Sequence, residues 1–385
     1  MMGEPQRFEL PRPIGRQDDL WGSTRREGRR TMLRRALQWT AAACGVGIAA
    51  PWDQRFGVGS KARAEPLRLD YDDLYTPEID EAIELGLEFL VNQQQPDGGF
   101  RGQQYSRNVA VIGLAGLAFL SNGGLPGRGR WGRALEKCVT YIVDSCEDSG
   151  FIVRPGTTGH GPMYGHGFAA LFLAEVYGVS PQARVRDCLK AAIDLIVRCQ
   201  GPEGGWRYDP RPTRGDLSVT VCQVMALRAA RNAGIYVPAE TIERALDYVR
   251  RSQNPDGGFM YQITGGGGES RFALTAAAVV ALYSVGQYSG KELEQAIRFL
   301  QERFDNDAGL YRNGYYFYAH YYSVQAFWIL GGDAWQSWYR ALSRQIMNQR
   351  YPDGRWEDMI GREYATAMAC IILSVPRSTL PIFQR

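Results

Sequence analysis

Histidines are few in this chain, and two of them stand at places comparable to that of an aspartate. The chain has three histidines. His166 and His320 lie at the beginnings of two apolar stretches, and Asp216 directly precedes a third. Imidazole and carboxylate groups suit zinc, and three protein ligands with one open position form a Lewis-acid site. These three residues are therefore candidate metal ligands, although such a histidine can instead cap a helix or bond within a polar site.

Other polar and aromatic residues stand near the beginnings of the same apolar stretches. The candidate catalytic residues are Asp216, His320 and Tyr364. The candidate ligand-binding residues are His166, Glu269, Arg271 and Tyr318. Aromatic residues are dense from Tyr311 to Trp328, where their faces can stabilise carbocations, stack on sugar rings or pack in the core. The cofactor is left open, with zinc as the hypothesis.

The elements that would position these side chains are marked by a repeated turn. Residues 252–259 read Ser-Gln-Asn-Pro-Asp-Gly-Gly-Phe, and related segments, two of them eroded, occur at 94–100, 147–151, 200–206, 305–310 and 348–356. The copies lie about 45 to 55 residues apart, a period typical of repeat architectures. Proline, aspartate and glycine are turn residues, so we interpret the motif as structural.

Two kinds of helix are predicted to alternate between the turns. Amphipathic stretches carry apolar residues at helical spacing, and each is followed by a stretch that is almost wholly apolar. The predicted pairs are 78–93 with 109–120, 131–146 with 165–176, 185–199 with 217–230, 241–252 with 272–285, 291–304 with 318–330, and 335–350 with 364–374. Six such helical hairpins predict an all-α fold, an (α/α)6 toroid with an inner and an outer layer. An open solenoid is the alternative, but neither terminal repeat has the polar outer face that a solenoid cap requires.

The two ends of such a toroid would differ. The connections that lead from an outer to an inner helix contain the repeated turn and are the longer ones, as at 150–164, 206–215 and 260–269. Long loops gathered at one end of a rigid scaffold usually carry function. We therefore expect the functional site at this end, among residues that begin the inner helices.

The repeats resemble those of the prenyltransferase and squalene(-hopene) cyclase superfamily, the terpenoid cyclase and protein prenyltransferase toroids. The signature Gln-x-x-Asp-Gly-Gly-Trp is best matched by Gln94–Phe100, Cys199–Trp206 and Gln253–Phe259. The resemblance implies a toroid whose central cavity binds or transforms an isoprenoid or other apolar ligand. Similar rings also serve thioester domains and polysaccharide enzymes.

The sequence departs from the family's two best-known chemistries. The Asp-x-Asp-Asp acid motif of the cyclases occurs once, at Asp70–Asp73, but before the first repeat, where acidic residues also gather to cap helices. The Asp-x-Cys zinc pair of the prenyltransferases is missing from the matching place. The alternative function is therefore a non-catalytic exported toroid that binds a protein or lipid partner. A third hypothesis, polysaccharide cleavage, would pair Asp216 with Glu269 as acid and base.

Residues 1–64 read as an export signal ahead of a single toroid domain at 65–385. Paired arginines precede an uncharged run at 36–50, which is shorter than the roughly 20 residues that span a bilayer, and Ala62-Arg63-Ala64 is a small-residue cleavage site. The arginine pairs indicate the twin-arginine route and a periplasmic or cell-envelope location. A disordered basic tail is the alternative, and Cys44 is a candidate lipidation site.

Charge and cysteine content limit the possible partners. The formal net charge is +3, and the excess of basic residues lies in the first 64 residues. No cluster of Lys and Arg interleaved with aromatics follows, so no nucleic-acid partner is predicted. Cysteine spacings fit no CxxC pattern, so we expect buried free thiols. Disulfides are the alternative if the protein is exported.

Overall fold

The computed structural model describes residues 74–102, 105–157, 161–263, 268–304, 315–377 and 380–383. All of them belong to one unit of the chain, Asp70–Arg385. Over these ranges the protein has twelve α-helices and two short 3₁₀ helices but no named strand. None of the described helices is long and apolar enough to span a bilayer. The predicted export signal and Asp70–Asp73 lie outside the described residues, and the domain boundary at residue 64 stays a prediction.

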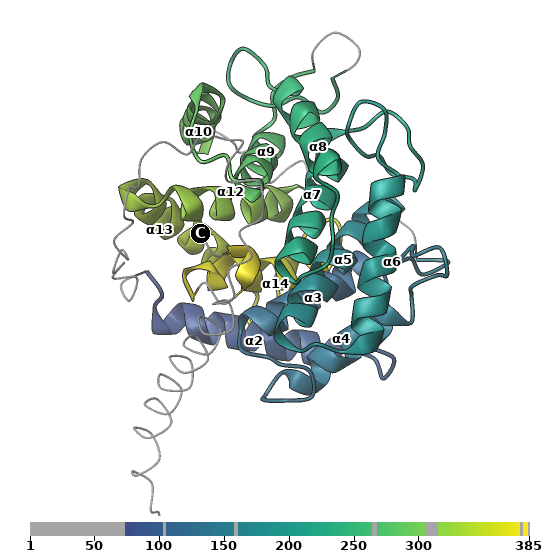
Figure 1. The fold of residues 1–385 in the computed structure, drawn as a ribbon. Coiled ribbons are helices and arrows are strands. Elements are labelled where there is room, and N and C mark those ends of the chain that lie inside the picture. Colours follow the sequence, from purple (N-terminus) through teal and green to yellow (C-terminus); the bar gives the residue numbers. More distant parts are fainter. Residues whose placement is uncertain are drawn as a thin grey trace, which may run out of the picture. The chain divides into compact units, whose positions relative to one another are not determined.

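The helices form two layers (Figure 1). The inner layer is α3 (Val109–Ser121), α5 (Pro162–Val179), α7 (Leu217–Asn232), α9 (Phe272–Ser284), α12 (Tyr316–Leu330) and α14 (Arg362–Ser374). The outer layer is α2 (Pro77–Gln93), α4 (Gly132–Val143), α6 (Ala183–Arg198), α8 (Ala239–Arg251), α10 (Lys291–Phe304) and α13 (Gly332–Asn348). Each inner helix contacts the next inner helix, and α14 contacts α3. The predicted closed (α/α)6 toroid is therefore confirmed, and the open solenoid is wrong.

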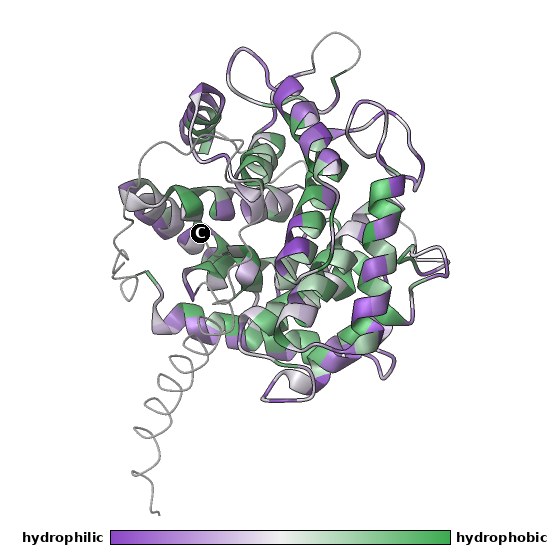
Figure 2. Ribbon diagram, viewed as in Figure 1, coloured by the Kyte–Doolittle hydropathy of each residue, from purple (hydrophilic) through white to green (hydrophobic). Residues whose placement is uncertain are grey.

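Side-chain pattern explains the layering. Twelve of the thirteen residues of α3 are buried, because inner helices have neighbours on nearly every side. In α8 the buried residues are Thr241, Ala245, Tyr248 and Val249, which form a single stripe facing the inner layer. Figure 2 shows the same contrast between the apolar inner helices and the two-sided outer ones. Each fully buried large apolar side chain contributes roughly 1.5–3 kcal/mol.

The repeated turn has the same backbone geometry in each described copy. At 254–258 the Asn254 N–H donates to the Gly258 carbonyl over 2.8 Å, and the Gly257 N–H donates to the Asn254 carbonyl over 3.0 Å. Gly257 has φ +86°, and a Cβ there would lie 2.6 Å from the Gln295 carbonyl oxygen of the next outer helix. The glycine is required both by its left-handed backbone and by this close approach.

The glutamine before each turn joins neighbouring repeats. The Nε2 groups of Gln94, Gln200 and Gln253 donate to carbonyls in the first turn of the following outer helix, those of Ala134, Thr241 and Glu292. The distances are 3.1, 2.9 and 2.8 Å. These bonds also satisfy carbonyl lone pairs near a helix start. We call this contact the glutamine stitch, and it confirms a structural role for the motif.

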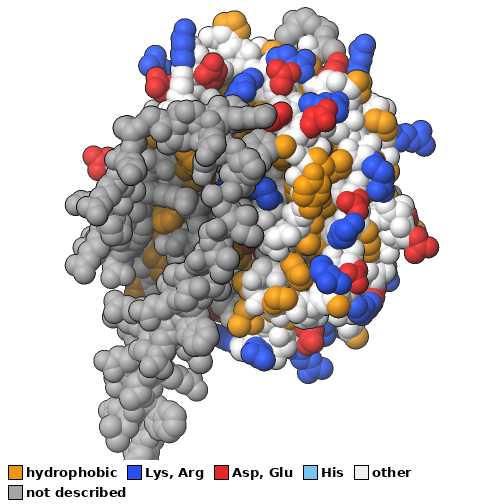
Figure 3. Space-filling view, in the orientation of Figure 1, with side chains coloured by type: hydrophobic (Ala, Val, Ile, Leu, Met, Phe, Trp, Pro, Cys, Tyr) orange, Lys and Arg blue, Asp and Glu red, His pale blue; other side chains and the backbone are white. Residues whose placement is uncertain are grey.

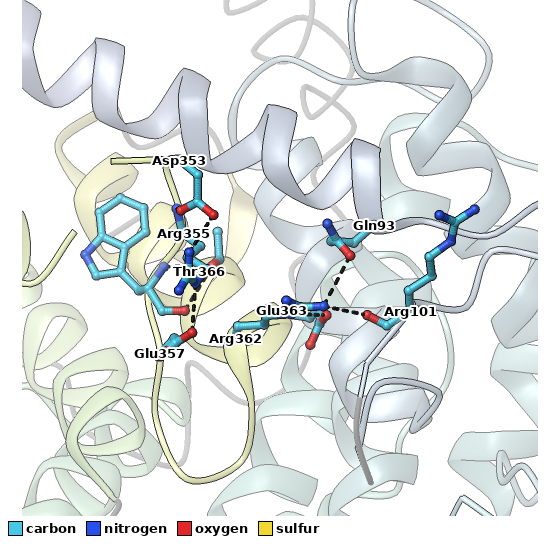
Figure 4. A network of polar contacts seen from close by, with 9 residues as sticks. Gln93, Arg101, Asp353, Arg355, Glu357, Arg362, Glu363 and Thr366 are labelled. Atoms are coloured by element: carbon cyan, nitrogen blue, oxygen red, sulfur yellow. Dashed lines mark hydrogen bonds and ion pairs between the residues drawn. The ribbon is translucent and has the colours of Figure 1, made fainter. Parts of the chain in front are cut away.

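The last repeat bonds to the first across the closure of the ring (Figure 4). Arg362, at the start of α14, donates to Gln93 Oε1 over 3.4 Å and to the Arg101 carbonyl over 3.3 Å, and it pairs with Glu363. At the other end of α14, Ser374 donates to Ser121 over 3.2 Å. The closure is therefore held by polar contacts as well as by helix packing.

The end of the ring where the inner helices finish is occupied by the C-terminal segment. The 3₁₀ helices Val375–Arg377 and Pro381–Phe383 contact inner helices, the second of them both α7 and α12. Ile382 is buried, and its backbone bonds the buried Glu175. A ligand site is thus expected at the opposite end, where the inner helices begin. On the face drawn in Figure 3, basic and acidic side chains are interspersed.

Candidate functional site

Tyrosines from opposite sides of the ring meet in its interior. Helices α5 and α12 are not neighbours in the ring, yet Phe168 of α5 packs edge-on against Tyr321 of α12 with centroids 6.1 Å apart. Tyr318 and Tyr322 of α12 also pack edge-on, at 5.0 Å. Their hydroxyls are buried and make no hydrogen bond of normal geometry within the described part of the chain. We call Tyr164, Tyr318, Tyr321, Tyr322 and Tyr364 the interior tyrosines.

Asp216 lies beside these tyrosines at the start of α7. It is the N-cap residue: Oδ1 accepts from the Val219 N–H over 2.9 Å and from the Ser218 hydroxyl over 2.6 Å. The Tyr164 hydroxyl donates in turn to Ser218. Asp216 is fully buried, and its charge acts on Tyr318. The carboxyl is therefore held by one oxygen within the interior.

The second carboxyl oxygen of Asp216 is less firmly held than the first. Oδ2 is buried and makes no hydrogen bond of normal geometry to any described residue, although the Tyr261 hydroxyl approaches the carboxyl and favours its charged form. Burial raises the pKa of Asp216, against the opposing effects of Ser218, Val219 and the charge of Arg207. Such a group retains its proton at higher pH than a surface aspartate and can donate it.

A rim of half-buried residues surrounds Asp216. The Tyr208 and Tyr261 hydroxyls are hydrogen-bonded to each other. Arg207 lies over the Tyr208 ring, 5.7 Å from its centroid, and Arg271 lies over the Tyr261 ring at 5.9 Å. Arg271 is thus at the rim, as expected for a ligand-binding residue, but it is exposed and does not reach the interior.

A second carboxyl, which the sequence reasoning missed, lies next to Tyr364. Asp358 Oδ1 accepts from the backbone N–H groups of Ile360 and Gly361 over 2.8 and 3.2 Å, while Oδ2 is buried without a partner among the described residues. Burial raises the pKa of Asp358 to about 6. Its position in the loop before an inner helix is the signal that could have identified it, because Asp216 stands at a similar place.

His166, predicted as a metal or ligand-binding residue, faces the outer layer instead. Its Nδ1 accepts from the Ile152 N–H over 3.1 Å, and its Nε2 donates to the Ala192 carbonyl of α6 over 3.2 Å. Burial lowers its pKa to about 4. With both ring nitrogens bonded to backbone, the neutral imidazole connects a turn to an outer helix.

The same position is filled by threonine in three other repeats. The hydroxyls of Thr220, Thr275 and Thr366 each accept the backbone N–H of the aromatic residue that ends the repeated turn, those of Trp206, Phe259 and Trp356, over 3.0 Å. Since Ile152 donates to His166 in the same way, His166 is the histidine version of a structural position. Aligning the inner helices from their starts would have shown this.

His320 is also directed away from the interior. It packs against Tyr316, with ring centroids 4.4 Å apart, and against Phe272 and Phe304 of the adjoining helices, both at 6.1 Å. Nδ1 lies 3.3 Å from the Ser323 hydroxyl oxygen. Burial among these rings lowers its pKa to about 3, so the imidazole is neutral.

The three candidate metal ligands therefore do not converge. His166 and His320 face the outer layer on different helices, whereas Asp216 faces the interior. Among the described residues, no group of three His, Cys, Asp or Glu side chains is placed to hold a metal ion. His160, the third histidine, lies outside these residues. The zinc hypothesis has no ligand set in this part of the chain.

Of the remaining predicted site residues, the structure brings some together. Tyr364 is buried and lies near both Tyr318 and Asp358, and Tyr318 lies near Asp216. Glu269 is exposed in the loop before α9, so it does not share the buried surroundings of Asp216. The acid and base pair expected for polysaccharide cleavage is not assembled from these two residues.

The comparisons with known proteins agree with the fold. The family model described as the prenyltransferase alpha-alpha toroid domain matches residues 79–189 and 182–314. A curated relative, drimenyl diphosphate synthase of Streptantibioticus cattleyicolor, is 33% identical over 123 residues. That match covers 32% of this chain and only 22% of the relative.

Solved structures share the toroid at low sequence identity. The type II terpene cyclase MstE from Scytonema, in complex with geranylgeranyl dihydroxybenzoate, has a TM-score of 0.56 and 17% identity, covering 81% of this chain and 100% of that one. Cellobiose 2-epimerase from Spirochaeta thermophila has a TM-score of 0.60 and 15% identity, covering 80% and 98%. An alpha-1,6-mannanase of Salegentibacter has a TM-score of 0.59 and 10% identity, covering 77% and 98%.

These structures include both terpene and sugar enzymes, so the shared ring establishes the fold alone. The family model, however, matches more than half of the chain. Together with the six helical hairpins and their repeated turns, this match shows that the chain belongs to the prenyltransferase alpha-alpha toroid family.

Proposed function

We propose that the protein binds an isoprenoid or similarly apolar ligand among the interior tyrosines, and that Asp216 protonates a double bond of that ligand. The observation that carries this proposal is the state of Asp216: a fully buried carboxyl with a raised pKa, held through Oδ1, whose Oδ2 is approached by the Tyr261 hydroxyl but makes no hydrogen bond of normal geometry to a described residue. Burial favours the protonated form of the carboxyl, and this is the form that can donate a proton to an alkene carbon.

The proposed step can be written in full. The proton leaves Asp216 Oδ2, the π electrons of the alkene form a new C–H bond, and the neighbouring carbon becomes a cation. The Ser218 hydroxyl, the Val219 N–H and the charge of Arg207 stabilise the resulting carboxylate. Tyrosine faces attract a cation without reacting with it as a carboxylate would.

The step that ends the reaction requires a base. Asp358, whose pKa is about 6, is mainly ionised at neutral pH. It lies near Tyr364 and has a buried Oδ2 without a partner in the described part of the chain. In the proposed reaction Asp358 accepts the proton lost from a carbon next to the cation, which restores a double bond. The product is then an isomer of the substrate. Asp358 returns its proton to solvent, and Asp216 takes up a proton from solvent before the next turnover.

The comparisons support this class of ligand. The solved MstE chain is matched along its full length by part of this chain, and its description gives a geranylgeranyl compound as substrate. The drimenyl diphosphate synthase match also names a terpenoid product, although it covers little of that protein. The proposal therefore needs only a single ring and no second toroid.

A non-catalytic role is the second candidate, and one observation favours it. Tyr315 and Met359, which lie at the beginning of α12 and beside Asp358, are 56% and 73% exposed. Exposed apolar side chains beside a site can contact a lipid or protein partner. In that case the interior tyrosines would form a core, and Asp216 would serve only as an N-cap.

The experiment uses the purified full chain with farnesol, geranylgeraniol and their diphosphates as probes. Binding is followed by intrinsic fluorescence, and products are identified by gas chromatography with mass spectrometry. We expect wild type to convert at least one probe to isomers. Asp216→Asn should retain binding, because Asn keeps the N-cap, but turn over about 10²- to 10⁴-fold more slowly. Wild type that binds the probes and leaves them unchanged would instead support the non-catalytic role.

A matched variant tests the other acid that the sequence offers. Asp73→Asn removes a carboxyl of the Asp-x-Asp-Asp motif and leaves Asp216 intact. If Asp216 is the proton donor, Asp73→Asn retains most of the turnover. If Asp73→Asn is inactive and Asp216→Asn is active, the motif is the acid and our assignment is wrong.

A further inference from the structure

Two free thiols, Cys146 and Cys188, come together on the outer layer. Cys146 follows α4 at the beginning of the second repeated turn and is half-buried, and Cys188 lies on α6 and is 7% exposed. Each thiol affects the pKa of the other, and the Cys146 thiol donates to the Glu147 carbonyl over 3.8 Å. The proposed chemistry of the ring interior uses neither residue.

Contacts on both sides of Cys146 independently place its segment against α6. Before it, Asp144 accepts from Arg184 over 2.8 Å. After it, the Ser149 carbonyl accepts from Arg198 over 3.0 Å, and Gly150 packs so closely on the Ala191 carbonyl that a Cβ would clash. Cys188 is one helical turn beyond Arg184, on the same face of α6.

The repeat register gives the same pairing. In three other turns, the turn's glycine packs on one carbonyl of the next outer helix, and the stitch glutamine bonds the carbonyl three residues earlier. The pairs of glutamine acceptor and glycine contact are Ala134 and Lys137, Thr241 and Arg244, and Glu292 and Gln295. In the second turn, Gly150 packs on Ala191. The residue three positions earlier is Cys188.

Cys146 occupies the glutamine position of that turn. The turn hydrogen bonds align Glu147 with Gln95, because each donates its N–H to the carbonyl four residues on, over 2.9 and 2.7 Å. Cys146 is thus equivalent to Gln94. In the second repeat, Cys146 therefore stands in place of the stitch glutamine, and Cys188 stands in place of the residue that this glutamine would contact.

We propose that Cys146 and Cys188 form a disulfide under oxidising conditions and that this bond replaces the glutamine stitch of the second repeat. The oxidant is a small-molecule or protein disulfide. The bond would join the end of α4 to α6 and close a loop of about 43 residues, a length at which a crosslink restricts the unfolded chain appreciably.

Exposure sets the order of events, because Cys146 is half-buried whereas Cys188 is only 7% exposed. In the same sense, the neighbouring Cys188 lowers the pKa of Cys146, whereas Cys146 and burial raise the pKa of Cys188. The Cys146 thiolate attacks the oxidant disulfide and expels one thiolate. Cys188 then loses its proton to water and attacks the Cys146 sulfur, which expels the second thiolate. Two electrons pass from the protein to the oxidant, which becomes two thiols.

The first test uses the purified full chain, reduced and then treated with oxidised glutathione. After alkylation and trypsin digestion, we expect the peptides carrying Cys146 and Cys188 to be joined, with a mass lower by two hydrogen atoms. Cys199→Ser, which removes the buried thiol at the C-cap of α6, should leave this product unchanged. Alkylation of both thiols after native oxidation, or glutathione retained on Cys146, would overturn the proposal.

The second test asks whether the disulfide stabilises the fold as a glutamine stitch does or forms without any effect on stability. Oxidised wild type should melt several degrees above reduced wild type, and Cys146→Ser should lose this difference. Cys146→Gln restores the side chain of the other repeats, so it should melt above Cys146→Ser under reducing conditions. If oxidation leaves the Tm of wild type unchanged, or if Gln is no better than Ser, the proposed role is wrong.

Discussion

The two sides of each inner helix perform different tasks. On α7, Asp216 meets the interior tyrosines, while Thr220 one turn later accepts the Trp206 N–H of a repeated turn. His166 has the position of Thr220 in its own repeat, and its Nδ1 likewise accepts a backbone N–H of the repeated turn, that of Ile152. Position in the repeat, rather than residue type, therefore decides whether a polar side chain belongs to the candidate site. The predictions below test this difference, beginning with the largest expected change.

Gly257→Val tests the turns that join the outer layer. The variant would place a β-branched residue at φ +86° and a Cβ 2.6 Å from the Gln295 carbonyl oxygen. We expect the free energy of unfolding to fall by about 3 kcal/mol or more, from backbone strain together with the clash. Urea unfolding gives the value.

A matched control separates the two causes. Gly123→Val meets a similar φ of +82°, but nothing lies within 4 Å of its Cβ. It should be less destabilising than Gly257→Val. Equal losses would mean that the approach to the next outer helix contributes nothing.

His166→Ala tests the outward-facing position. Removal of the imidazole leaves the buried Ile152 N–H and Ala192 carbonyl without their partner, so unfolding free energy should fall by about 1–3 kcal/mol. Turnover of the folded fraction should be close to that of wild type, measured at a temperature well below the Tm. A loss of turnover at unchanged Tm would return His166 to the candidate site.

Glu175→Gln tests the end of the ring opposite to the site. Burial raises the pKa of Glu175 from 4.5 to about 8. The unfolded chain therefore loses this proton at lower pH than the folded chain does. As pH rises from about 4.5 to about 8, wild type should lose stability relative to Glu175→Gln, by at most about 1.4 kcal/mol per pH unit. Urea unfolding at several pH values measures this difference, and parallel curves for the two proteins would contradict the burial argument.

Much of the fold could be predicted from sequence, because the turns and the apolar periodicity repeat. Helix α10 has the predicted limits, Lys291–Phe304. Helix α5 starts at Pro162, earlier than predicted, because Gly161 has φ +79° and proline fits the first turn of a helix. The outer helices were recognisable because each buries only one face, as α8 does, so that apolar residues recur at helical spacing.

The site was harder to predict because the inner helices are buried on both sides. A helix such as α12, in which nearly every residue is buried, has no apolar stripe to distinguish the interior from the outer layer. His320 and Tyr318 are two residues apart on it, yet only Tyr318 meets the interior group. Asp358 was missed because it lies in the loop, four residues before α14 begins, and not at the start of the inner helix itself, where candidates were sought.

The most direct test of the proposed acid is turnover in D₂O. Because the first step adds a solvent-exchangeable proton from Asp216 to carbon, the product formed by wild type should carry one deuterium at a non-exchangeable position. Asp216→Asn should form this labelled product about 10²- to 10⁴-fold more slowly than wild type, whereas His166→Thr should form it as wild type does. Unlabelled product, or labelled product from Asp216→Asn at the wild-type rate, would contradict protonation by Asp216.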